Sequence, residues 1–465
     1  MKENIEKLNL AFDLDGIIID LFNYQIKEGM RHFNITNIED INIDKYDIKN
    51  IFNCNDEDRK KFWTFKRFTD YCLNSELIDG AVELINKLQK DGHEVGCITA
   101  RFGVTENDIV GKYCRYLIEK RFKKEKIKFD YIDYCSEKLS PRDKLIACNK
   151  RKVVFLIEDK VDNALNIALN SSTKVIMPIY PNNKLDENVN GIIYVDKVNN
   201  AYDIIDNYSK ELFMTHQKDV LKFKKNGEAK IFNNKKINNL SKEDVNIYER
   251  QLYNYYKNLP YNDKKIKYQD RNYKIAEVIT SFWIEKYLKL NIINKEFIPY
   301  QDGVIYIANH LTKKDHFLIS MVLRHKVIKY LAACELFDQF YGSYFNACGC
   351  IPIKRGNTIE AIKDQFKALN ELTKLVVNNN NILLYPEGGR NKDDVLLKPF
   401  LTGYLTIAQQ TGAPICPIVI NDDYTRGNLT AMVSEDLYYV KTTDNFDDVN
   451  HVIHSNMKTM IKKIK

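Results

Sequence analysis

Short apolar runs that stop at an acidic residue alternate with helical segments along much of this 465-residue chain. The run LNLAF stops at Asp13, and the run VVFLI stops at Glu158. Residues 81–91 lie between them with apolar side chains at helical spacing, and the strand-like run EVGCIT follows. Because alternating strands and helices are joined as βαβ units, the pattern predicts a parallel, doubly wound α/β sheet covered by helices.

The α/β pattern occurs in two parts of the chain, separated by a charged segment. We expect a first domain over 1–208, with a helical, aromatic insertion over about 20–78, and a second domain over 271–465. In the second domain the expected strands cover 304–309, 351–353, 381–386 and 415–420. The intervening residues 209–270 hold 14 Lys and Arg against 8 Asp and Glu. This helical connector suits an anionic membrane surface, although a solvated linker explains its charge equally well.

The composition argues against several classes of protein. The ten cysteines lack the spacing of a metal site or a disulfide framework, so we expect a cytoplasmic protein. The first residues lack the pattern of a signal peptide, and no run of about 18 apolar residues could span a bilayer. The basic stretch 218–236 contains no recognised nucleic-acid-binding module, so no nucleic acid is expected. Any contact with lipid is therefore expected to be peripheral, at the inner face of the membrane. Residues 275–290 predict either a core helix or an interfacial one.

A histidine and an aspartate follow the first strand expected in the second domain. The segment Asn309-His310-Leu311-Thr312-Lys313-Lys314-Asp315 spaces them with four residues between. Acyl transfer to a hydroxyl needs a base near neutral pKa, which histidine supplies, and a carboxylate on the other ring nitrogen fixes the histidine tautomer. An isolated pair with this spacing is more often a surface histidine beside an unrelated acid.

Three further motifs follow this pair in the second domain. GCIPIKRG ends a strand with Lys354 and Arg355, and YPEGGR forms a Gly-rich turn with Glu387, Gly388 and Arg390. Arginine suits bidentate contact with phosphate, and glycine lets the backbone approach a substrate closely. The fourth motif, PICPIVI, predicts a buried strand. Taken singly, each motif is explained as a charged turn or as a structural strand.

Together the four motifs resemble the glycerolipid acyltransferase family, whose blocks are NH-x4-D, G-x-I-x-I-x-R, F/Y-P-E-G-T/S-R and V-P-V/I. The resemblance implies a catalytic pair of His310 and Asp315. It also implies phosphate contacts from Arg355 and Arg390, and acceptor binding by Glu387 and Gly388. The implied acceptor is lysophosphatidate or a related glycerophospholipid, and the implied donor is acyl-CoA or acyl-carrier protein. Gly389 and Lys313-Lys314 depart from the family pattern and bear on the identity of the acceptor.

Acidic residues at two strand ends suggest a phosphate site in the first domain. Asp13 and Asp15 follow one strand, and Asp159 follows another. Such carboxylates can share a Mg²⁺ ion, with one acting as nucleophile and another as acid or base. Thr99 ends a strand, and Lys144 lies near the start of a helix, where each could bind phosphate. Singly, Thr99 and Lys144 are more often ordinary surface residues.

In the order nucleophile, threonine, lysine and acid pair, these elements resemble the haloacid dehalogenase superfamily, in its 5′-deoxynucleotidase-like branch. The resemblance implies a Rossmann-like domain in which residues 20–78 form a helical cap. It implies an aspartyl-phosphate at Asp13, protonation of the leaving group by Asp15, and Mg²⁺ held by Asp13, Asp15 and Asp159. Thr99 and Lys144 would bind phosphate, while Glu158 stands where this branch usually has Asp.

The main interpretation is a bifunctional enzyme, with a lipid acyltransferase joined to a Mg²⁺-dependent phosphomonoester hydrolase. In a second interpretation only the phosphatase is catalytic, and the other half binds lipid. In a third, the N-terminal domain is regulatory or inert. The intact His310 and Asp315 argue against the second interpretation, and the intact Asp13 and Lys144 argue against the third.

Overall fold

The structure is a computed structural model that describes residues 5–180, 183–185, 189–215, 242–287, 289–339, 342–356, 358–393, 395–423 and 425–464. The chain divides into two compact units, Met1–Asp219 and Val220–Lys465, each with its own sheet. The boundary expected near residue 208 falls within helix α9 (Ala201–Thr215), whose Ser209 hydroxyl donates to the carbonyl of Glu6. Part of the expected connector, residues 216–241, lies outside the described residues.

The sheet of the first unit is parallel throughout, as predicted. Its strands are β1 (Asn9–Phe12), β2 (Glu94–Ala100), β3 (Tyr131–Cys135), β4 (Phe155–Ile157), β5 (Lys174–Pro178) and β6 (Ile192–Val195). They lie in the order β3-β2-β1-β4-β5-β6. The strand order therefore reverses between β1 and β4, and parallel sheets bind ligands beyond the carboxyl ends of the strands at such a point. Asp13 and Glu158 directly follow these two strands.

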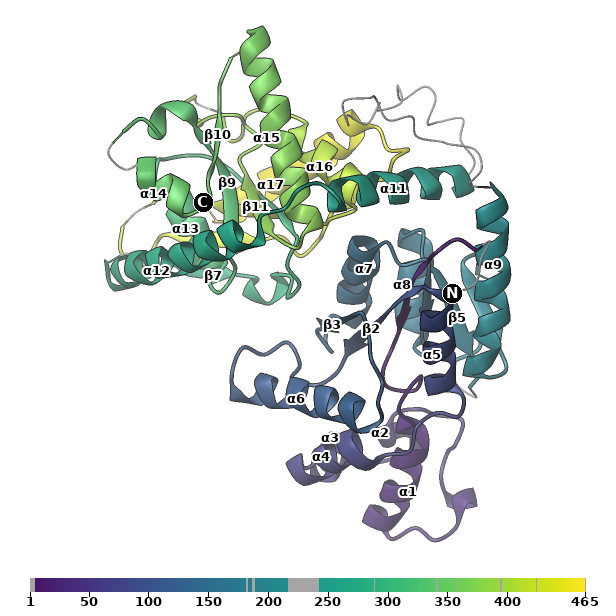
Figure 1. Cartoon of the computed structure of the whole chain (residues 1–465). Coiled ribbons are helices and arrows are strands. Elements are labelled where there is room, and N and C mark those ends of the chain that lie inside the picture. The colour runs from purple at the N-terminus through teal and green to yellow at the C-terminus, as the bar shows by residue number, and fades with distance from the viewer. Residues whose placement is uncertain are drawn as a thin grey trace. The chain divides into compact units, whose positions relative to one another are not determined.

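Helices α5 (Ala81–Asp91), α6 (Ile109–Lys124), α7 (Ser140–Arg151) and α8 (Val161–Asn170) connect these strands (Figure 1). A separate group, α1 (Leu21–Phe33), α2 (Ile48–Ile51), α3 (Asp56–Phe62) and α4 (Phe65–Asn74), occupies the stretch predicted as a helical cap. Side chains of Asp20, Asn55 and Thr64 cap α1, α3 and α4, which fixes where these helices begin. Aromatic pairs such as Tyr24 with Tyr71, at 5.0 Å between ring centroids, join the helices of the cap.

The second unit contains a mixed sheet. Its strands are β7 (Asn291–Ile293), β8 (Ile305–Ala308), β9 (Ile328–Ala333), β10 (Ile351–Ile353), β11 (Asn381–Leu384), β12 (Ile415–Ile420) and β13 (Thr430–Val433). They lie in the order β10-β9-β11-β8-β12-β13-β7, and only the pairing of β12 with β13 is antiparallel among the described strands. The carboxyl ends of β8, β10 and β11 therefore meet at one edge of the sheet.

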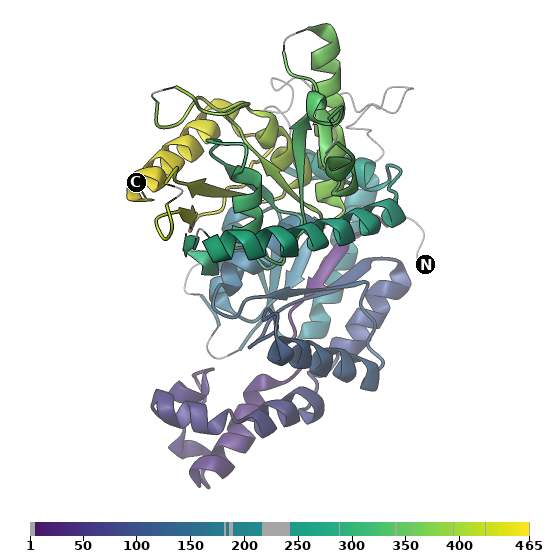
Figure 2. The same cartoon turned by 90° about the vertical axis from the view of Figure 1, so that its left-hand side faces the viewer.

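Helices cover both faces of this sheet (Figure 2). They are α11 (Lys242–Lys257), α12 (Asp263–Tyr287), α13 (Asp315–Val322), α14 (Gly342–Ala347), α15 (Ile359–Val377), α16 (Gly403–Thr411) and α17 (Phe446–Ile464). Alternate residues of β8 enter different cores, because successive strand side chains point to opposite faces. Ile305 and Ile307 pack with α15, α16 and α17, whereas Tyr306 and Ala308 pack with α12 and α13.

Helix α12 begins twelve residues earlier than the apolar pattern at residue 275 predicts. An ion pair holds its first half on the sheet, since Asp270 lies 2.7 Å from the buried ammonium of Lys329 on β9. Tyr273 packs into the core, whereas Tyr268, Ile275, Val278 and Phe282 are exposed. Within the described parts of the chain, no helix combines the length and apolar character needed to cross a bilayer.

Candidate active sites

The loop between β8 and α13 brings His310 and Asp315 together. The Nδ1 atom of His310 lies 2.8 Å from Oδ2 of Asp315. Asp315 is the first residue of α13 and is fully buried, whereas the side chain of His310 is 17% exposed. A carboxylate on one ring nitrogen fixes the tautomer, so Nε2 is the nitrogen that can exchange a proton with a substrate.

The carboxylate of Asp315 is held by its own loop. Its Oδ2 accepts hydrogen bonds from the backbone N–H of Leu311 at 2.6 Å and of Thr312 at 2.8 Å, and its Oδ1 accepts from the Thr312 hydroxyl at 2.7 Å. Together with His310, these donors set a single orientation for the carboxylate. The four residues between His310 and Asp315 therefore form a loop whose backbone N–H groups and threonine hydroxyl bind the carboxylate of Asp315.

Glu387, from the turn after β11, supports the same loop. Its Oε1 accepts from the backbone N–H of His310 at 2.8 Å, and its Oε2 accepts from the N–H of Lys398 at 3.0 Å. Burial raises the pKa of Glu387, and these two hydrogen bonds oppose the rise. Tyr385 stacks on the imidazole, with ring centroids 4.2 Å apart. Both carboxylate oxygens thus contact the backbone, and this geometry supports a positioning role for a residue that we had expected to bind the acceptor.

Gly388 allows the turn that presents Glu387. Its φ is +69°, in the left-handed region that favours glycine, and a Cβ there would lie 2.7 Å from Cδ1 of Leu401. The N–H of Leu401 donates to the carbonyl of Pro386 at 2.8 Å and closes the turn. Gly389, by contrast, has no described atom within 4 Å of a Cβ built on it.

Asn309 has a role that the sequence motif alone does not reveal. Its buried amide donates to the carbonyl of Ile420 and accepts from the N–H of the same residue, both at 2.9 Å. This double contact joins the end of β8 to the end of β12. The loop that carries His310 therefore starts from a fixed point.

The two arginines expected to bind phosphate lie at different distances from this loop. Arg390 is half-buried, and the next residue, Asn391, donates its N–H to the carbonyl of His310 at 2.6 Å. Arg355 is exposed and follows β10, which is separated from β8 by β9 and β11. Three strand spacings correspond to about 14 Å. The structure thus brings the backbone at Arg390 beside the dyad and places Arg355 farther along the same edge.

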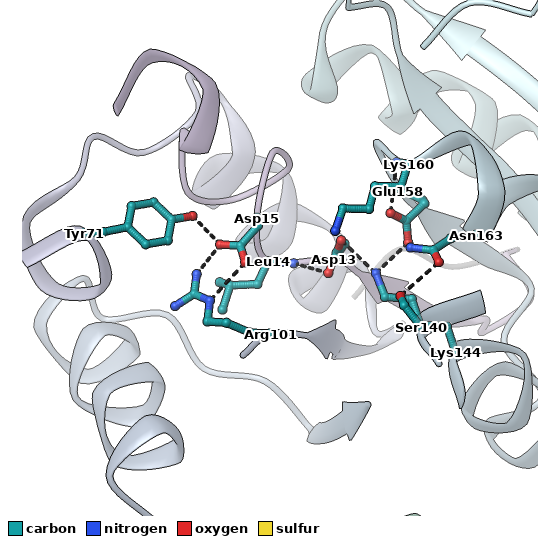
Figure 3. A network of polar contacts seen from close by, with 10 residues as sticks. All are labelled: Asp13, Leu14, Asp15, Tyr71, Arg101, Ser140, Lys144, Glu158, Lys160 and Asn163. Carbon is teal, nitrogen blue, oxygen red and sulfur yellow. Dashed lines mark hydrogen bonds and ion pairs between the residues drawn. The ribbon is translucent and has the colours of Figure 1, made fainter. Parts of the chain in front are cut away.

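In the first unit, Asp13, Glu158 and Asp159 form a buried group. One carboxylate oxygen from each lies within 4.8 Å of the others. The ammonium of Lys144 lies 2.7 Å from Oδ2 of Asp13 and 2.7 Å from Oε2 of Glu158, as Figure 3 shows. Glu158, rather than the carboxylate of Asp15, therefore completes the acidic group. Lys144, which the sequence analysis expects to bind phosphate, therefore lies beside the nucleophile candidate.

The charges of this group are unbalanced. Burial, followed by repulsion from Glu158, raises the pKa of Asp13 from 3.8 to about 7. Burial and the same neighbour raise the pKa of Asp159 well above its usual value. Glu158 is different, since burial raises its pKa but the charge and hydrogen bond of Lys144, with the backbone N–H of Lys160, together lower it. Lys144, with Lys160 as a second nearby cation, thus compensates only part of the charge of three carboxylates.

The group fits a Mg²⁺ ion. Carboxylate oxygens are the ligands that Mg²⁺ prefers, and a divalent cation would balance the excess charge. Both oxygens of Asp159 are buried without a well-formed hydrogen bond from the described residues. The hydroxyl of Thr99, at the end of β2, is also buried and lacks a partner within the described ranges. An unsatisfied buried polar atom is costly unless a ligand meets it, so Thr99 fits the phosphate role expected for it.

Asp15 points toward a separate pair of residues, which Figure 3 shows on the far side of Leu14. Its carboxylate accepts hydrogen bonds from the guanidinium of Arg101 and from the hydroxyl of Tyr71 in the cap. Burial raises the pKa of Asp15, but the charge of Arg101 and the hydrogen bonds from Arg101 and Tyr71 together bring it below its usual value. Sequence reasoning did not identify Arg101 or Tyr71 as site residues. The arginine that follows Thr99-Ala100 was visible in the motif, whereas Tyr71 gave no local indication.

Part of the C-terminal unit is similar to known proteins. Residues 289–421 match the family model described as "Acyltransferase", so the C-terminal unit contains an acyltransferase-family domain. A similar curated protein is the chloroplastic 1-acyl-sn-glycerol-3-phosphate acyltransferase BAT2 of Brassica napus, 30% identical over 148 residues, which cover 31% of this chain and 41% of the relative. The chain spans 36–50% of the length of three such curated relatives.

Two solved structures are similar to parts of the chain. The 1-acyl-sn-glycerophosphate acyltransferase PlsC from Thermotoga maritima is 19% identical with a TM-score of 0.34, over 47% of this chain and 88% of that one. A haloacid dehalogenase-like family hydrolase from Xanthomonas campestris is 13% identical with a TM-score of 0.29, over 44% of this chain and 99% of that one. The strand order of the N-terminal unit is that of a doubly wound parallel sheet.

Proposed function

We propose that the C-terminal unit transfers a fatty acyl group from acyl-CoA or acyl-carrier protein to the hydroxyl of 1-acylglycerol-3-phosphate or a related glycerophospholipid. The observation that supports this most is the 2.8 Å contact between His310 and Asp315. Nε2 of His310 takes the proton of the acceptor hydroxyl as its oxygen attacks the thioester carbonyl. The C–O bond forms, the C–S bond breaks, and the imidazolium returns the proton to the thiolate. Asp315 stabilises the imidazolium between these steps.

The phosphate of the acceptor would lie at the edge where Arg390 and Arg355 follow their strands. Arg390 adjoins Asn391, which contacts the His310 loop, so we assign it the first contact with phosphate. Arg355, farther along the edge, would add long-range attraction. The membrane contact we propose is peripheral, through the exposed apolar side chains of Tyr268, Ile275 and Val278 on α12.

The test is acyl transfer by the purified chain, with lysophosphatidate or glycerol-3-phosphate as acceptor and each donor in turn. His310→Ala should lower the rate by about 10²–10⁴-fold. His451→Ala, an exposed histidine on α17, is the matched control and should keep full activity. A wild-type chain that acylates neither acceptor would contradict the proposal and favour a lipid-binding role for this unit. Flotation with anionic vesicles that persists at high salt would support insertion of α12, because salt screens charge attraction.

A second activity is proposed for the N-terminal unit, which is hydrolysis of a phosphomonoester. It is supported by the buried acidic group, the Lys144 contacts and the unpartnered Thr99 hydroxyl. Asp13, Glu158 and Asp159 would hold Mg²⁺, which when bound would neutralise charge on the phosphoryl group. Asp13 would attack phosphorus through a carboxylate oxygen, and Lys144 and Thr99 would hold the phosphoryl oxygens. Asp15, fixed by Arg101 and Tyr71, would exchange a proton with the leaving group and then with water.

The corresponding assay offers a panel of phosphomonoesters with Mg²⁺, including deoxynucleoside monophosphates, and compares the wild type with Asp13→Asn. Loss of all hydrolysis in Asp13→Asn with acyl transfer unchanged would support two independent sites. Hydrolysis that survives in Asp13→Asn would contradict the assignment of the nucleophile.

A further inference from the structure

An exposed aromatic surface lies on the N-terminal unit, where α4 packs against α6. Phe65 at the start of α4 is 67% exposed, and Ile109 at the start of α6 is 84% exposed. Phe102 and Tyr116 are also more than half exposed. Rings link these positions, since Phe65 stacks on Tyr113 at 5.1 Å and Phe68 meets Phe102 at 6.1 Å. We call the surface formed by six residues the α4–α6 surface, namely Phe65, Phe68, Phe102, Ile109, Tyr113 and Tyr116.

Cations surround this surface. Helix α6 carries six Lys and Arg residues against Glu119 alone, although residues 1–208 have a net charge of −3. Lys112 and Lys120 are exposed, and the Lys120 ammonium lies 5.6 Å from the ring centroid of Tyr116. Glu106 and Asp108, in the loop before α6, are the opposing charges. The exposed lysines of α6 therefore lie beside the exposed rings, whereas Arg121 is buried and pairs with Glu125.

This combination fits an anionic bilayer better than a protein partner. Exposed apolar patches mark interaction sites, and the cores of protein interfaces are depleted in lysine. Surfaces that bind the headgroup zone instead combine aromatic and aliphatic side chains with Lys and Arg. The charge of α6 is complementary to phosphate headgroups.

The α4–α6 surface also adjoins the phosphatase site. Phe102 directly follows Arg101, which holds Asp15. Tyr71, the other partner of Asp15, lies three residues after Phe68 and so faces the same side of α4. An apolar group seated on Phe68 and Phe102 would therefore leave its polar end close to Asp15.

We infer that the α4–α6 surface docks on an anionic bilayer and presents a lipid phosphomonoester to Asp13. The inference rests on the proposed phosphatase activity and names its substrate class. In the reaction, the bond between phosphorus and the lipid oxygen breaks, water supplies the new oxygen on phosphorus, and a lipid alcohol and inorganic phosphate leave. The acylated product proposed for the C-terminal unit is itself a lipid phosphomonoester, so one chain holds a site that forms this class and a site that consumes it.

The test uses the full chain with Mg²⁺ and two substrates, soluble p-nitrophenyl phosphate and phosphatidate in phosphatidylcholine vesicles. In the double variant Phe65→Ser/Ile109→Ser, hydrolysis of vesicle phosphatidate should fall by about tenfold or more, because less apolar surface is buried on docking. The soluble substrate, which needs no docking, should be turned over within about twofold of wild type. Leu169→Ser, an equally exposed apolar residue on α8, is the matched control and should change neither rate.

A second variant tests the charge. Lys112→Glu/Lys120→Glu should lower vesicle hydrolysis by about fivefold or more for each lysine and reduce its dependence on salt. A wild-type chain that hydrolyses only the soluble substrate would overturn this inference and leave the phosphatase proposal standing. One that hydrolyses neither would overturn both. Vesicle hydrolysis that is unchanged in the two double variants would also overturn the inference. So would variants that change the oligomeric state of the chain and leave vesicle hydrolysis unchanged.

Discussion

Of four described hydrogen bonds that Asp315 accepts, the one from Nδ1 of His310, at 2.8 Å, links the carboxylate to the candidate base. The other three come from Leu311 and Thr312, so the same carboxylate orders the loop and orients the imidazole. Removing the charge of Asp315 should therefore affect both catalysis and the fold of the loop, whereas removing His310 should affect mainly catalysis.

Asp315→Asn should reduce acyl transfer about as strongly as His310→Ala and should also destabilise the unit. Asparagine offers one acceptor oxygen where the aspartate offers two, so at least one donor of the buried loop loses its partner, at a cost of about 1–3 kcal/mol. His310→Ala removes one partner of Asp315 but leaves the bonds from Leu311 and Thr312 in place, so its loss of melting temperature should be the smaller of the two. Calorimetry on both variants checks this difference, and equal stability of the two would contradict the account of the loop.

His316, the residue after Asp315, should make stability depend on pH. Burial lowers its pKa from 6.5 to about 4, with a smaller opposing effect from Asp315. The neutral form is thus favoured by folding, so the stabilisation is complete above pH 6.5 and is lost as the pH falls toward 4. The slope is about 1.4 kcal/mol per pH unit. His316→Phe should flatten denaturant midpoints measured from pH 7 to pH 5, whereas His451→Phe on the surface should leave the slope unchanged.

The parts of each site that are local in sequence could be predicted. His310 and Asp315 share one loop, and Asp13 and Glu158 each directly follow an apolar run that forms a strand. Contacts between distant segments could not. Glu387 reaches His310 only because β11 lies beside β8, and Asn309 bonds Ile420 only because β12 lies on the other side. Strand order is decided by packing across the whole sheet, which short motifs do not encode.

Two missed features have a common physical cause. Strand β9 has Lys329 at an interior position, and a lysine there argues against a buried strand. The strand is nevertheless buried because Asp270 on α12 pairs with that lysine at 2.7 Å. The start of α12 was missed for the same reason, since its charged first half gives little apolar periodicity. The sequence of each segment disfavours the buried strand or the helix that it forms, and the contact with the other segment explains why it forms.

Mg²⁺ should stabilise the N-terminal unit. Asp159→Asn should be more stable than the wild type without the metal and less stable than the wild type with it. Saturating metal at about 100 times its Kd adds about 2.7 kcal/mol, which corresponds to about 5–10 °C in a unit of this size. Asp159→Asn removes a buried charge without a well-formed hydrogen bond, so in EDTA the variant should melt above the wild type. With Mg²⁺ it should melt below the wild type. Calorimetry of the full chain checks both conditions, and a metal-induced shift that is equal in both proteins would contradict the assigned ligand.

Gly388 and Gly389 are neighbours in one turn but should respond differently to substitution. Gly388→Ala places a Cβ at a φ of +69° and against Leu401, so we expect a loss of about 1–2 kcal/mol and, through Glu387, a slower acyl transfer. Gly389 lacks both constraints in the described structure, so Gly389→Ala should be neutral or stabilising by about 0.4–1 kcal/mol. Gly389→Ser, which restores the hydroxyl of the family pattern, should fold equally well. Melting temperatures and acyl transfer rates of the three variants decide the matter, because equal losses at both glycines would mean that the turn tolerates no side chain at all.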